Sequence, residues 1–433
     1  MQKDRFGNTF APELPYARGS ILSSTEEDFR KLTRAWQIIE RRIREKGKGS
    51  LFNFTGLERS FQVEPEDWQL VDDELSPVVY FKKFRALALE HLGGSPHEHD
   101  VALFNRLTAA TLATHFTLVK PGDVVVGVSV GYSHPSIVRA ARQVGARFVD
   151  TVGVKSFALA LEREERVSLV ALTRLAVTYE IMLLDELREV VHLAGEKGVP
   201  VYLDDAGGAR VGPAIFNQPR MLELGVDVGA TGLDKYGTYG PRLGLMAGQK
   251  ELVARIRAKA FEFGLEARPM LYAAVVKSLE RYDPKRVTAL VECTKRVAGE
   301  LRKLLGNKFH ETPVTAQLLA EDILEMAMER AGLKEPTIVP YEATAALAML
   351  LLQDYGILTV HFAGLPPGTS SFLFKFIPPE TLERFGGAGK FAEAVDASLS
   401  KLADIIEKPE NIRRLLLGVS VHDSFRPLWE EEV

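Results

Sequence analysis

The sequence VYLDDAGGARV at residues 201–211 and the sequence TGLDKYGTYGPRLG at residues 231–244 decide the fold class. In the first stretch an apolar run leads directly into Asp204 and then into small residues. In the second, Lys235 lies in a glycine-rich loop that follows another apolar run. Short apolar runs that end in such loops are typical of parallel strands covered on both faces. Both stretches therefore predict strands of an α/β sheet with reactive side chains at the strand ends.

Short apolar runs rich in valine, bounded by glycine or proline, occur along the middle of the chain, at residues 124–128, 146–149, 168–172, 200–203 and 226–230, and a further apolar strand is predicted at residues 243–247. Amphipathic helices are predicted between them, for example over residues 135–143, with Ser133 as the N-terminal cap, and over residues 184–197. Strands that alternate with helices indicate an α/β domain with a mainly parallel sheet between helices.

The regions on either side have other patterns. A helical pattern over residues 26–46 precedes the sheet, and a helical run over about residues 270–305 follows it. Residues 357–362 and 371–376 alternate as strands of a half-exposed sheet, covered by a helix near residues 390–406. We expect three parts, which are an N-terminal helical arm over residues 1–75, a large α/β domain over 76–285, and a connector helix with a small C-terminal α+β domain over 286–433.

The composition is that of an ordinary globular protein, with 433 residues, 26% of them charged and a formal net charge of −4. Interspersed charges argue against a dedicated nucleic-acid binder, and no uncharged apolar run is long enough for a membrane span. The single cysteine, Cys293, excludes an intrachain disulfide and a metal site of several thiolates. We expect a cytoplasmic protein with no DNA partner, no membrane partner and no metal.

Asp204 and Lys235 have the side chains needed to hold pyridoxal phosphate (PLP). Ligands of open α/β sheets bind beyond the carboxyl ends of the strands, where both residues are predicted to lie. A lysine amine can form a Schiff base with an aldehyde, and a carboxylate against a pyridine nitrogen keeps that ring protonated. Alternatively, Asp204 caps a helix and Lys235 is a solvated loop charge. Their order within one α/β domain favours the PLP interpretation.

Two further segments would complete a PLP site. Residues 105–111 open a predicted helix, whose first backbone N–H groups suit a phosphate. His134, at a predicted turn from strand to helix, is placed to stack on the ring, or else is a capping-turn residue. The predicted cofactor contacts beside Asp204 and Lys235 are Arg106, Thr108, Ala109, His134, Thr231 and Gly240.

The stretches around Asp204 and Lys235 resemble the selenocysteine synthase (L-seryl-tRNA selenium transferase) family, and within it the short archaeal selenocysteine-synthase-like proteins. The likeness spans about residues 50–405 and is most specific at residues 201–211, 234–235 and 240–248. Three shorter motifs contribute, at residues 52–56, 263–269 and 363–368. The resemblance implies the fold type I of PLP-dependent transferases, in which an aspartate aminotransferase-like large domain precedes a small α+β domain.

The resemblance also implies roles for single residues. Lys235 would form the Schiff base with PLP, Asp204 would contact the ring nitrogen, and His134 would stack on the ring. Phosphate contacts would lie near Thr108 and Ala109. Further residues are implied for anionic groups or for the substrate, and they are Asn53, Arg106, Arg242, Arg268 and Lys375.

The implied activity is that of a PLP-dependent transferase or lyase, which acts on an amine or amino-acid substrate by β-elimination or β-replacement, in a homodimer or higher homo-oligomer. The alternatives are an aminotransferase or other amino-acid-modifying enzyme, since fold does not fix reaction, and a non-catalytic PLP-binding or phosphometabolite-binding protein. A tRNA partner is not expected, because only about 50 residues precede the Asn53 motif and the chain is net acidic. Leu373 stands where related proteins often place a carboxylate-binding arginine, with Lys375 on the same strand face.

Overall fold

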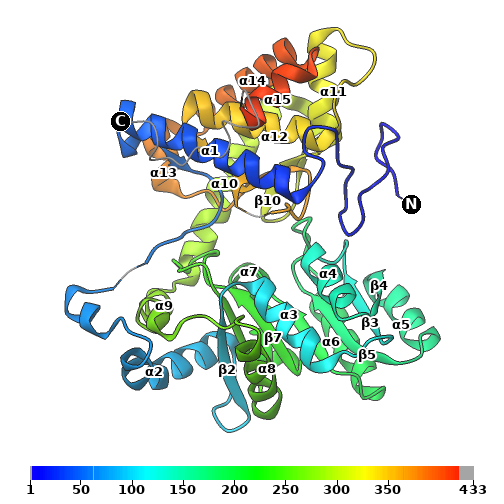
Figure 1. Ribbon diagram of the computed structural model, residues 1–433, viewed down its shortest axis with the longest axis vertical. Helices are drawn as coiled ribbons and strands as arrows, with labels where there is room; N and C mark the ends of the chain where they lie inside the picture. Colours follow the sequence, from blue (N-terminus) through cyan, green and yellow to red (C-terminus); the bar gives the residue numbers. More distant parts are fainter. Residues whose placement is uncertain (1, 62, 364, 419–433) are drawn as a thin grey trace. The chain divides into compact units, whose positions relative to one another are not determined.

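The computed structural model describes residues 2–61, 63–363 and 365–418 and divides the chain into two compact units (Figure 1). Unit 1 comprises Met1–Leu57 and Ala289–Val433, and unit 2 comprises Glu58–Thr288. This division differs from the three parts expected above, because the N-terminal segment up to Leu57 groups with the C-terminal part and the segment from Glu58 onward groups with unit 2. Within the described ranges, no helix combines the length and the hydropathy that a membrane span requires.

Unit 2 is built on a seven-stranded sheet with the order β2-β8-β7-β6-β5-β3-β4 (Figure 1). All neighbouring strands are parallel except β8, which runs antiparallel to both β2 and β7. The predicted mainly parallel sheet is thus confirmed. Its strands are β2 His99–Phe104, β3 Val124–Ser129, β4 Arg147–Val152, β5 Val167–Thr173, β6 Val201–Asp204, β7 Val228–Gly232 and β8 Gly244–Gln249.

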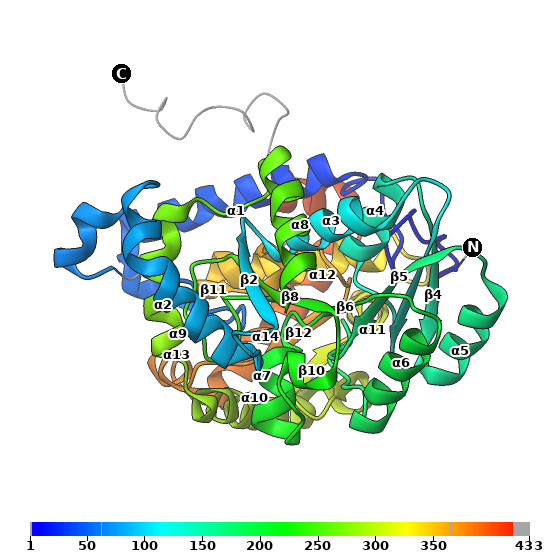
Figure 2. The same cartoon turned by 90° about the horizontal axis from the view of Figure 1, so that it is seen from below.

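Helices cover both faces of this sheet, because successive strand residues are apolar on alternate sides. In β3, Val126 packs into a core with α2, α5, α6 and α9, whereas Val125 packs into a second core with α3, α4 and α8. Figure 2 shows α3, α4 and α8 together on one side of the sheet. The helices of unit 2 are α2 Leu75–Leu92, α3 Leu107–Leu118, α4 Pro135–Gln143, α5 Gly153–Arg163, α6 Leu184–Glu196, α7 Gly208–Phe216, α8 Lys250–Glu262 and α9 Tyr272–Glu280, with short 3-10 turns at Pro65–Leu70, Met221–Leu224 and Pro269–Leu271.

Two features of this region were not predicted. The first is the edge strand β2, which follows a polar segment and pairs with β8, a strand far away in the sequence. The expected continuous helical run over residues 270–305 consists instead of α9 and α10 Pro284–Leu305. Proline disfavours helical geometry in the residue before it, so Pro284 starts a new helix rather than continuing α9.

Unit 1 combines helices with two small sheets. One sheet is antiparallel with the order β12-β10-β9, and the other is the parallel pair β1-β11. The alanine-rich helix α12 is buried along its whole length and packs against α11, α14 and α15. The elements of unit 1 are α1 Thr25–Lys46, β1 Phe52–Asn53, most of α10, β9 Phe309–Glu311, β10 Thr315–Leu318, α11 Ala320–Ala331, α12 Pro340–Leu350, β11 Ile357–Leu358, β12 Phe372–Lys375, α13 Pro379–Phe385, α14 Gly387–Ile406 and α15 Pro409–Leu417, with short helical turns at Lys48–Ser50, Gly306–Lys308, Leu351–Tyr355 and Val360–Phe362.

Both strands predicted for the small domain need correction. Residues 357–362 form only the two-residue strand β11, after which the chain turns in a 3-10 helix at Val360–Phe362. The strand β12 is buried on both faces rather than half exposed, because Phe372 and Phe374 pack into the unit 1 core while Leu373 and Lys375 are buried as well.

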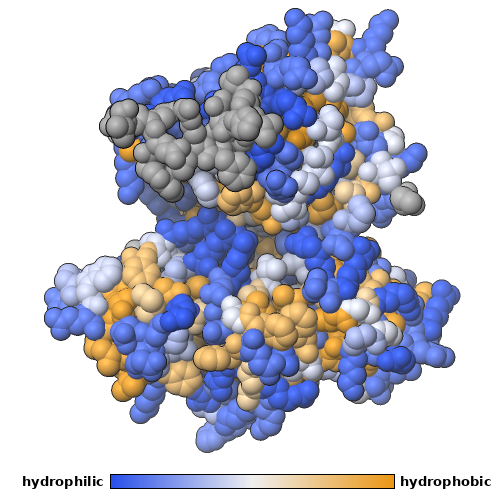
Figure 3. Space-filling view, viewed as in Figure 1, coloured by the Kyte–Doolittle hydropathy of each residue, from blue (hydrophilic) through white to orange (hydrophobic). Residues whose placement is uncertain are grey.

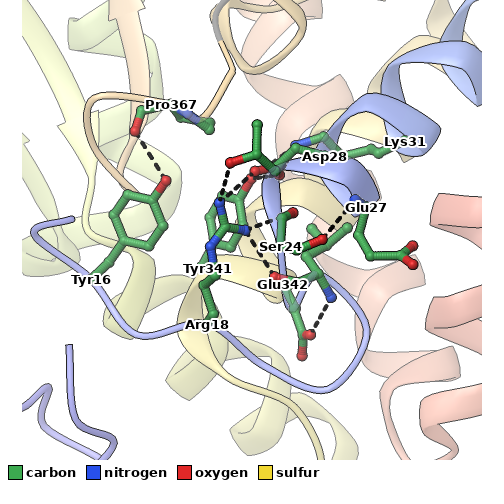
Figure 4. Close-up of polar contacts among 11 residues, drawn as sticks. Tyr16, Arg18, Ser24, Glu27, Asp28, Lys31, Tyr341, Glu342 and Pro367 are labelled. Carbon is green, nitrogen blue, oxygen red and sulfur yellow. Dashed lines mark hydrogen bonds and ion pairs between the residues drawn. The ribbon is translucent and has the colours of Figure 1, made fainter. Parts of the chain in front are cut away.

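A buried polar network holds the N-terminal segment within unit 1 (Figure 4). Asp28 on α1 pairs with Arg18 at 3.0 Å and with Lys31 at 3.4 Å. The Lys31 amine also donates to the Tyr341 hydroxyl at 3.0 Å. On α12, the Glu342 carboxylate accepts hydrogen bonds from two backbone amides of the N-terminal segment, at 2.7 and 2.9 Å. The segment before α1 is therefore an integral part of unit 1.

Candidate active site

Lys235 lies in the loop between β7 and β8 of unit 2. Backbone hydrogen bonds from Leu233 to Leu243, at 2.9 Å, and from Gly240 to Leu233, at 2.8 Å, close this loop onto itself. A Cβ atom at Gly232 would lie only 2.8 Å from the Lys235 Nζ. Glycine at position 232 therefore provides the space that the lysine amine occupies.

Asp204 ends β6, next to β7, and its side chain is buried. Its Oδ1 has no hydrogen-bond partner among the described residues. Burial raises the pKa of Asp204 to about 6, while the nearby Lys235 lowers it and Asp205 raises it further. A buried acceptor without a donor is costly, so this carboxyl is arranged to meet an N–H or O–H group that the described residues do not supply.

A group of cations surrounds the buried Asp234, the residue before Lys235. The Asp234 Oδ2 accepts from the Arg59 Nε at 3.1 Å and lies 3.6 Å from the Arg242 Nε, while the Lys235 Nζ is 4.0 Å from Oδ1. These three cations hold the pKa of Asp234 below its ordinary value although burial opposes them. Burial, together with the charges of Arg59 and Arg106, lowers the pKa of Arg242 to about 10. Positive charge thus exceeds negative charge beside Lys235, which favours an anionic ligand.

The start of α3 lies against the start of β8. A Cβ atom at Gly244 would be 2.8 Å from the backbone of Arg106 and Leu107, so only glycine allows this approach. Arg106 is exposed at the N-cap position, and in the first turn of the helix Thr108 is exposed and Ala109 is buried. The first turn of α3 presents backbone N–H groups of the kind that bind a phosphate at a helix start, and the phosphate contacts at Thr108 and Ala109 stay a prediction.

His134 is the N-cap of α4. Its Nδ1 accepts a hydrogen bond from the Ser136 backbone N–H at 3.1 Å. Burial, with the charges of Arg139 and Lys235, lowers the pKa of His134 to about 4, so the ring is neutral at neutral pH. The prediction of Ser133 as the cap is wrong, because the Ser133 hydroxyl donates instead to Asp150 at 2.7 Å.

Other predicted site residues are already engaged in local structure. The Thr231 hydroxyl is buried and bonds to Ala206 and to Arg210, so it supports the loop after β7 rather than offering a free donor. Arg268 is exposed and forms an ion pair with Asp73.

Gly240 has a φ of 83° and leaves room for the backbone of Ser60, which would lie 3.1 Å from a Cβ at that position. Asn53 and Lys375 belong to unit 1. The Asn53 side chain closes the turn over residues 53–57 through Thr55 and Leu57, and Lys375 is buried at the end of β12.

Comparison with known proteins identifies the family. No family model matches the chain. A UPF0425 pyridoxal phosphate-dependent protein of Methanothermobacter thermautotrophicus is 30% identical over 402 residues, which cover 92% of this chain and 100% of that protein. This chain belongs to the UPF0425 pyridoxal phosphate-dependent protein family. An L-seryl-tRNA(Sec) selenium transferase of Carboxydothermus hydrogenoformans is 26% identical over 155 residues, 34% of this chain and 33% of that protein, which confirms the predicted resemblance.

Solved structures confirm fold type I for this UPF0425 protein. The SepCysS chain of a SepCysS–SepCysE N-terminal domain complex superposes with a TM-score of 0.56 at 15% identity, over 84% of this chain and 98% of that chain. Aspartate aminotransferase of Thermotoga maritima superposes with a TM-score of 0.54 at 16% identity, over 84% of this chain and 97% of that chain. At such identities the likeness concerns the fold alone.

The side chains of this UPF0425 protein fit pyridoxal phosphate, the cofactor in the family name. The Lys235 amine has room beside Gly232, and the unpartnered Asp204 Oδ1 suits a pyridine N–H. The first turn of α3 and the cations near Asp234 suit a phosphate or another anionic group. The predicted residues Lys235, Asp204 and Arg242 thus meet in one unit, together with Arg59, for which no local sequence pattern gave a signal.

Proposed function

We propose that the protein is a PLP-dependent enzyme in which Lys235 binds the cofactor covalently, and that it catalyses β-elimination or β-replacement on an amine or amino acid. The observation that carries this proposal is the pairing of a loop lysine, in space kept open by Gly232, with a buried carboxyl oxygen that lacks a partner among the described residues. A solvated loop lysine and a helix-capping aspartate would need neither feature.

The proposed roles follow from the positions of the side chains. PLP, when bound, supplies an electron-accepting ring for charge that develops at the substrate carbon. Asp204 would hold the proton of the ring nitrogen through Oδ1, and its burial excludes water from that contact. The Lys235 Nζ would take and return a proton at the substrate Cα. His134 is neutral and would pack against the ring face without competing for the phosphate.

The cations beside Lys235 support a substrate with an acidic group in addition to its amine. Arg59, Arg242 and Lys235 share Asp234 as a buried counter-charge, and the charge of Arg106 also acts on Arg242, which leaves positive charge in excess. In β-elimination Lys235 would remove the Cα proton, and the group on Cβ would leave with the bonding electrons. Cations at that place stabilise an anionic leaving group, and for this reason we favour elimination or replacement over transamination.

Lysine trapping tests the cofactor assignment. PLP-loaded protein is reduced with borohydride and digested, and we expect the cofactor on the peptide that contains Lys235. Lys235→Ala should lose both the adduct and the visible absorption of a lysine-bound cofactor, whereas Lys155→Ala, a change at an exposed position of α5, should keep both. An adduct on another lysine would refute the assignment.

A substrate screen tests the reaction. Amines with a phosphate or sulfate ester on Cβ are compared with neutral analogues of the same shape, and we expect release of the acidic group only from the former. Arg242→Met should raise the KM for the acidic substrates more than for the neutral ones. A pyridoxamine product would establish the aminotransferase alternative, and cofactor that exchanges with no amine would favour a non-catalytic binding protein.

We also propose that the protein works as a cytoplasmic homodimer on a small molecule rather than on tRNA. The net charge of −4 supports the small-molecule substrate. Apolar side chains at the start of α2 support the dimer, since Leu75 and Val79 are about half exposed and Val78 is 84% exposed. Figure 3 shows hydrophobic side chains on the surface of unit 2 in the region of α2.

A further inference from the structure

A short hairpin over residues 174–182 joins the parts of the candidate site within unit 2. It follows β5 and is closed by an antiparallel bridge between Leu175 and Ile181 and by a backbone hydrogen bond from Met182 to Arg174 at 2.9 Å. The Arg174 guanidinium is fully buried and donates to the Asp205 carboxylate at 2.8 Å. The base of the hairpin is therefore anchored to the residue next to Asp204.

The tip of the hairpin reaches the lysine loop. The Tyr179 hydroxyl and the Tyr236 hydroxyl are hydrogen-bonded at 3.1 Å, and Tyr236 directly follows Lys235. A Cβ atom at Gly131, in the segment that leads to His134, would lie 3.2 Å from the Thr178 Oγ1 of the same hairpin. One nine-residue segment thus contacts the surroundings of all three predicted catalytic residues.

Both tyrosines have unusual backbone conformations. The φ angle is 66° at Tyr179 and 47° at Tyr236, in the left-handed region of backbone conformation that residues other than glycine rarely adopt. Such strain persists only where the surroundings hold it, and it concentrates at functional sites. The Tyr236 ring is buried and packs so closely on Gly207 that a Cβ atom there would lie 2.4 Å from the ring.

We propose that Tyr179 is a positioning residue for Lys235. Its hydroxyl holds Tyr236 in the left-handed conformation, and Tyr236 fixes the direction in which the preceding Lys235 side chain leaves its loop. This proposal rests on the proposed function of Lys235 as the lysine that binds PLP. Tyr179 itself acts through Tyr236 and is assigned no contact with the substrate.

Hydroxyl removal from either side tests the proposal. The variants are Tyr179→Phe, Tyr236→Phe and the double variant, with Tyr80→Phe as a control that removes the hydroxyl of a buried tyrosine on α2. For each variant we measure the dissociation constant of PLP, the pH at which the absorption of the lysine-bound cofactor titrates, and the thermal unfolding midpoint. We expect each single variant to bind PLP about five-fold more weakly, the change for one ordinary hydrogen bond, and to titrate at a shifted pH.

The double variant separates positioning from a purely structural role. Tyr179→Phe leaves the hydroxyl of the buried Tyr236 without this contact, whereas the double variant removes both hydroxyls, so its unfolding midpoint should recover from that of Tyr179→Phe toward that of the unsubstituted protein. The PLP affinity and the titration should not recover, because the link to Lys235 stays absent. Unchanged cofactor properties in the single variants, or recovery in step with the midpoint, would overturn the proposal. Failure of the unsubstituted protein to bind PLP at Lys235 would instead refute the proposed function.

Discussion

The carboxyl of Asp204 links the site to the stability of the protein. Burial raises its pKa to about 6 in the folded chain, against about 3.9 in an unfolded chain. Between these values the folded state binds more protons than the unfolded state. The free energy of unfolding of the cofactor-free protein therefore decreases as the pH rises from about 4 to about 6, and above that this contribution stays lost.

Asp204→Asn should abolish this decrease in the free energy of unfolding with rising pH. A neutral amide avoids the cost of a buried charge, so at pH 7 the cofactor-free variant should exceed the unsubstituted protein by up to ~3 kcal/mol in the free energy of unfolding, with the difference vanishing near pH 4. Urea unfolding between pH 4 and pH 8 measures it. Asp205 is present in both proteins and raises the pKa of Asp204, so the difference reports the Asp204 carboxyl together with its repulsion from Asp205. A constant difference across this pH range would contradict the assignment.

Gly207 makes a second prediction at the scale of single residues. A Cβ atom at this position would lie 2.4 Å from the Tyr236 ring and 3.3 Å from the Leu175 side chain. The ring is bonded to Tyr179 and cannot easily move away, so we expect Gly207→Ala to lower the free energy of unfolding by about 1–3 kcal/mol. Gly195→Ala is the control, because it adds a methyl group to α6 with nothing within 4 Å and should be neutral or stabilise by up to ~1 kcal/mol. Equal urea midpoints for the two variants would contradict the close packing.

Sequence patterns could predict only part of this site. The positions of Asp204 and Lys235 were predictable because Asp204 ends the apolar strand β6 and Lys235 follows β7 within three residues. Arg59 pairs with Asp234 across 175 residues, and Tyr179 meets Tyr236 across 57, so no local pattern marks either contact. Their roles depend on the arrangement of loops at the strand ends, which only the tertiary structure gives.

At the scale of whole elements, strands were predictable where apolar residues cover both faces. The parallel strands β3 and β5 fulfil this condition, since each contributes to both cores of unit 2. In unit 1 the alternation of apolar and polar residues predicted two half-exposed strands incorrectly. The strand β12 places Lys375 in a buried position, and β11 ends after two residues. Short strands receive their stability from neighbouring elements, so their own sequence determines them weakly.

The polar network of α1 makes a prediction for unit 1. Lys31 and Asp28 are fully buried, and burial lowers the pKa of Lys31 although Asp28 opposes this. Asp28→Asn removes the counter-charge of the buried amine and should cost about 3–5 kcal/mol in the free energy of unfolding. Lys31→Met should cost less, because Asp28 keeps its ion pair with Arg18 and its hydrogen bond with Tyr341. Urea unfolding, together with hydrogen exchange over residues 16–31, measures both effects, and the reverse order would contradict the role given to Asp28.

At the scale of the whole molecule, the proposed dimer predicts that a second copy binds at the apolar start of α2. Val78 is 84% exposed, and with Leu75 and Val79 in the first turns of α2 it forms an apolar stretch on unit 2. Adjacent exposed apolar residues mark interaction surfaces more often than scattered ones do. A symmetric dimer would bury this stretch twice, since each copy offers the same surface to the other.

Val78→Asp should therefore convert the proposed dimer into a monomer. A carboxylate at the centre of an apolar contact would have to lose its water without gaining a partner, in both copies at once. Light scattering should give the mass of two chains for the unsubstituted protein and of one chain for Val78→Asp. The control is Val152→Asp, which changes another exposed valine of unit 2 at the N-cap of α5, where aspartate is favourable, and it should keep the mass of two chains. Dimers in both variants would place the interface elsewhere, because an interface across α2 does not tolerate two buried carboxylates.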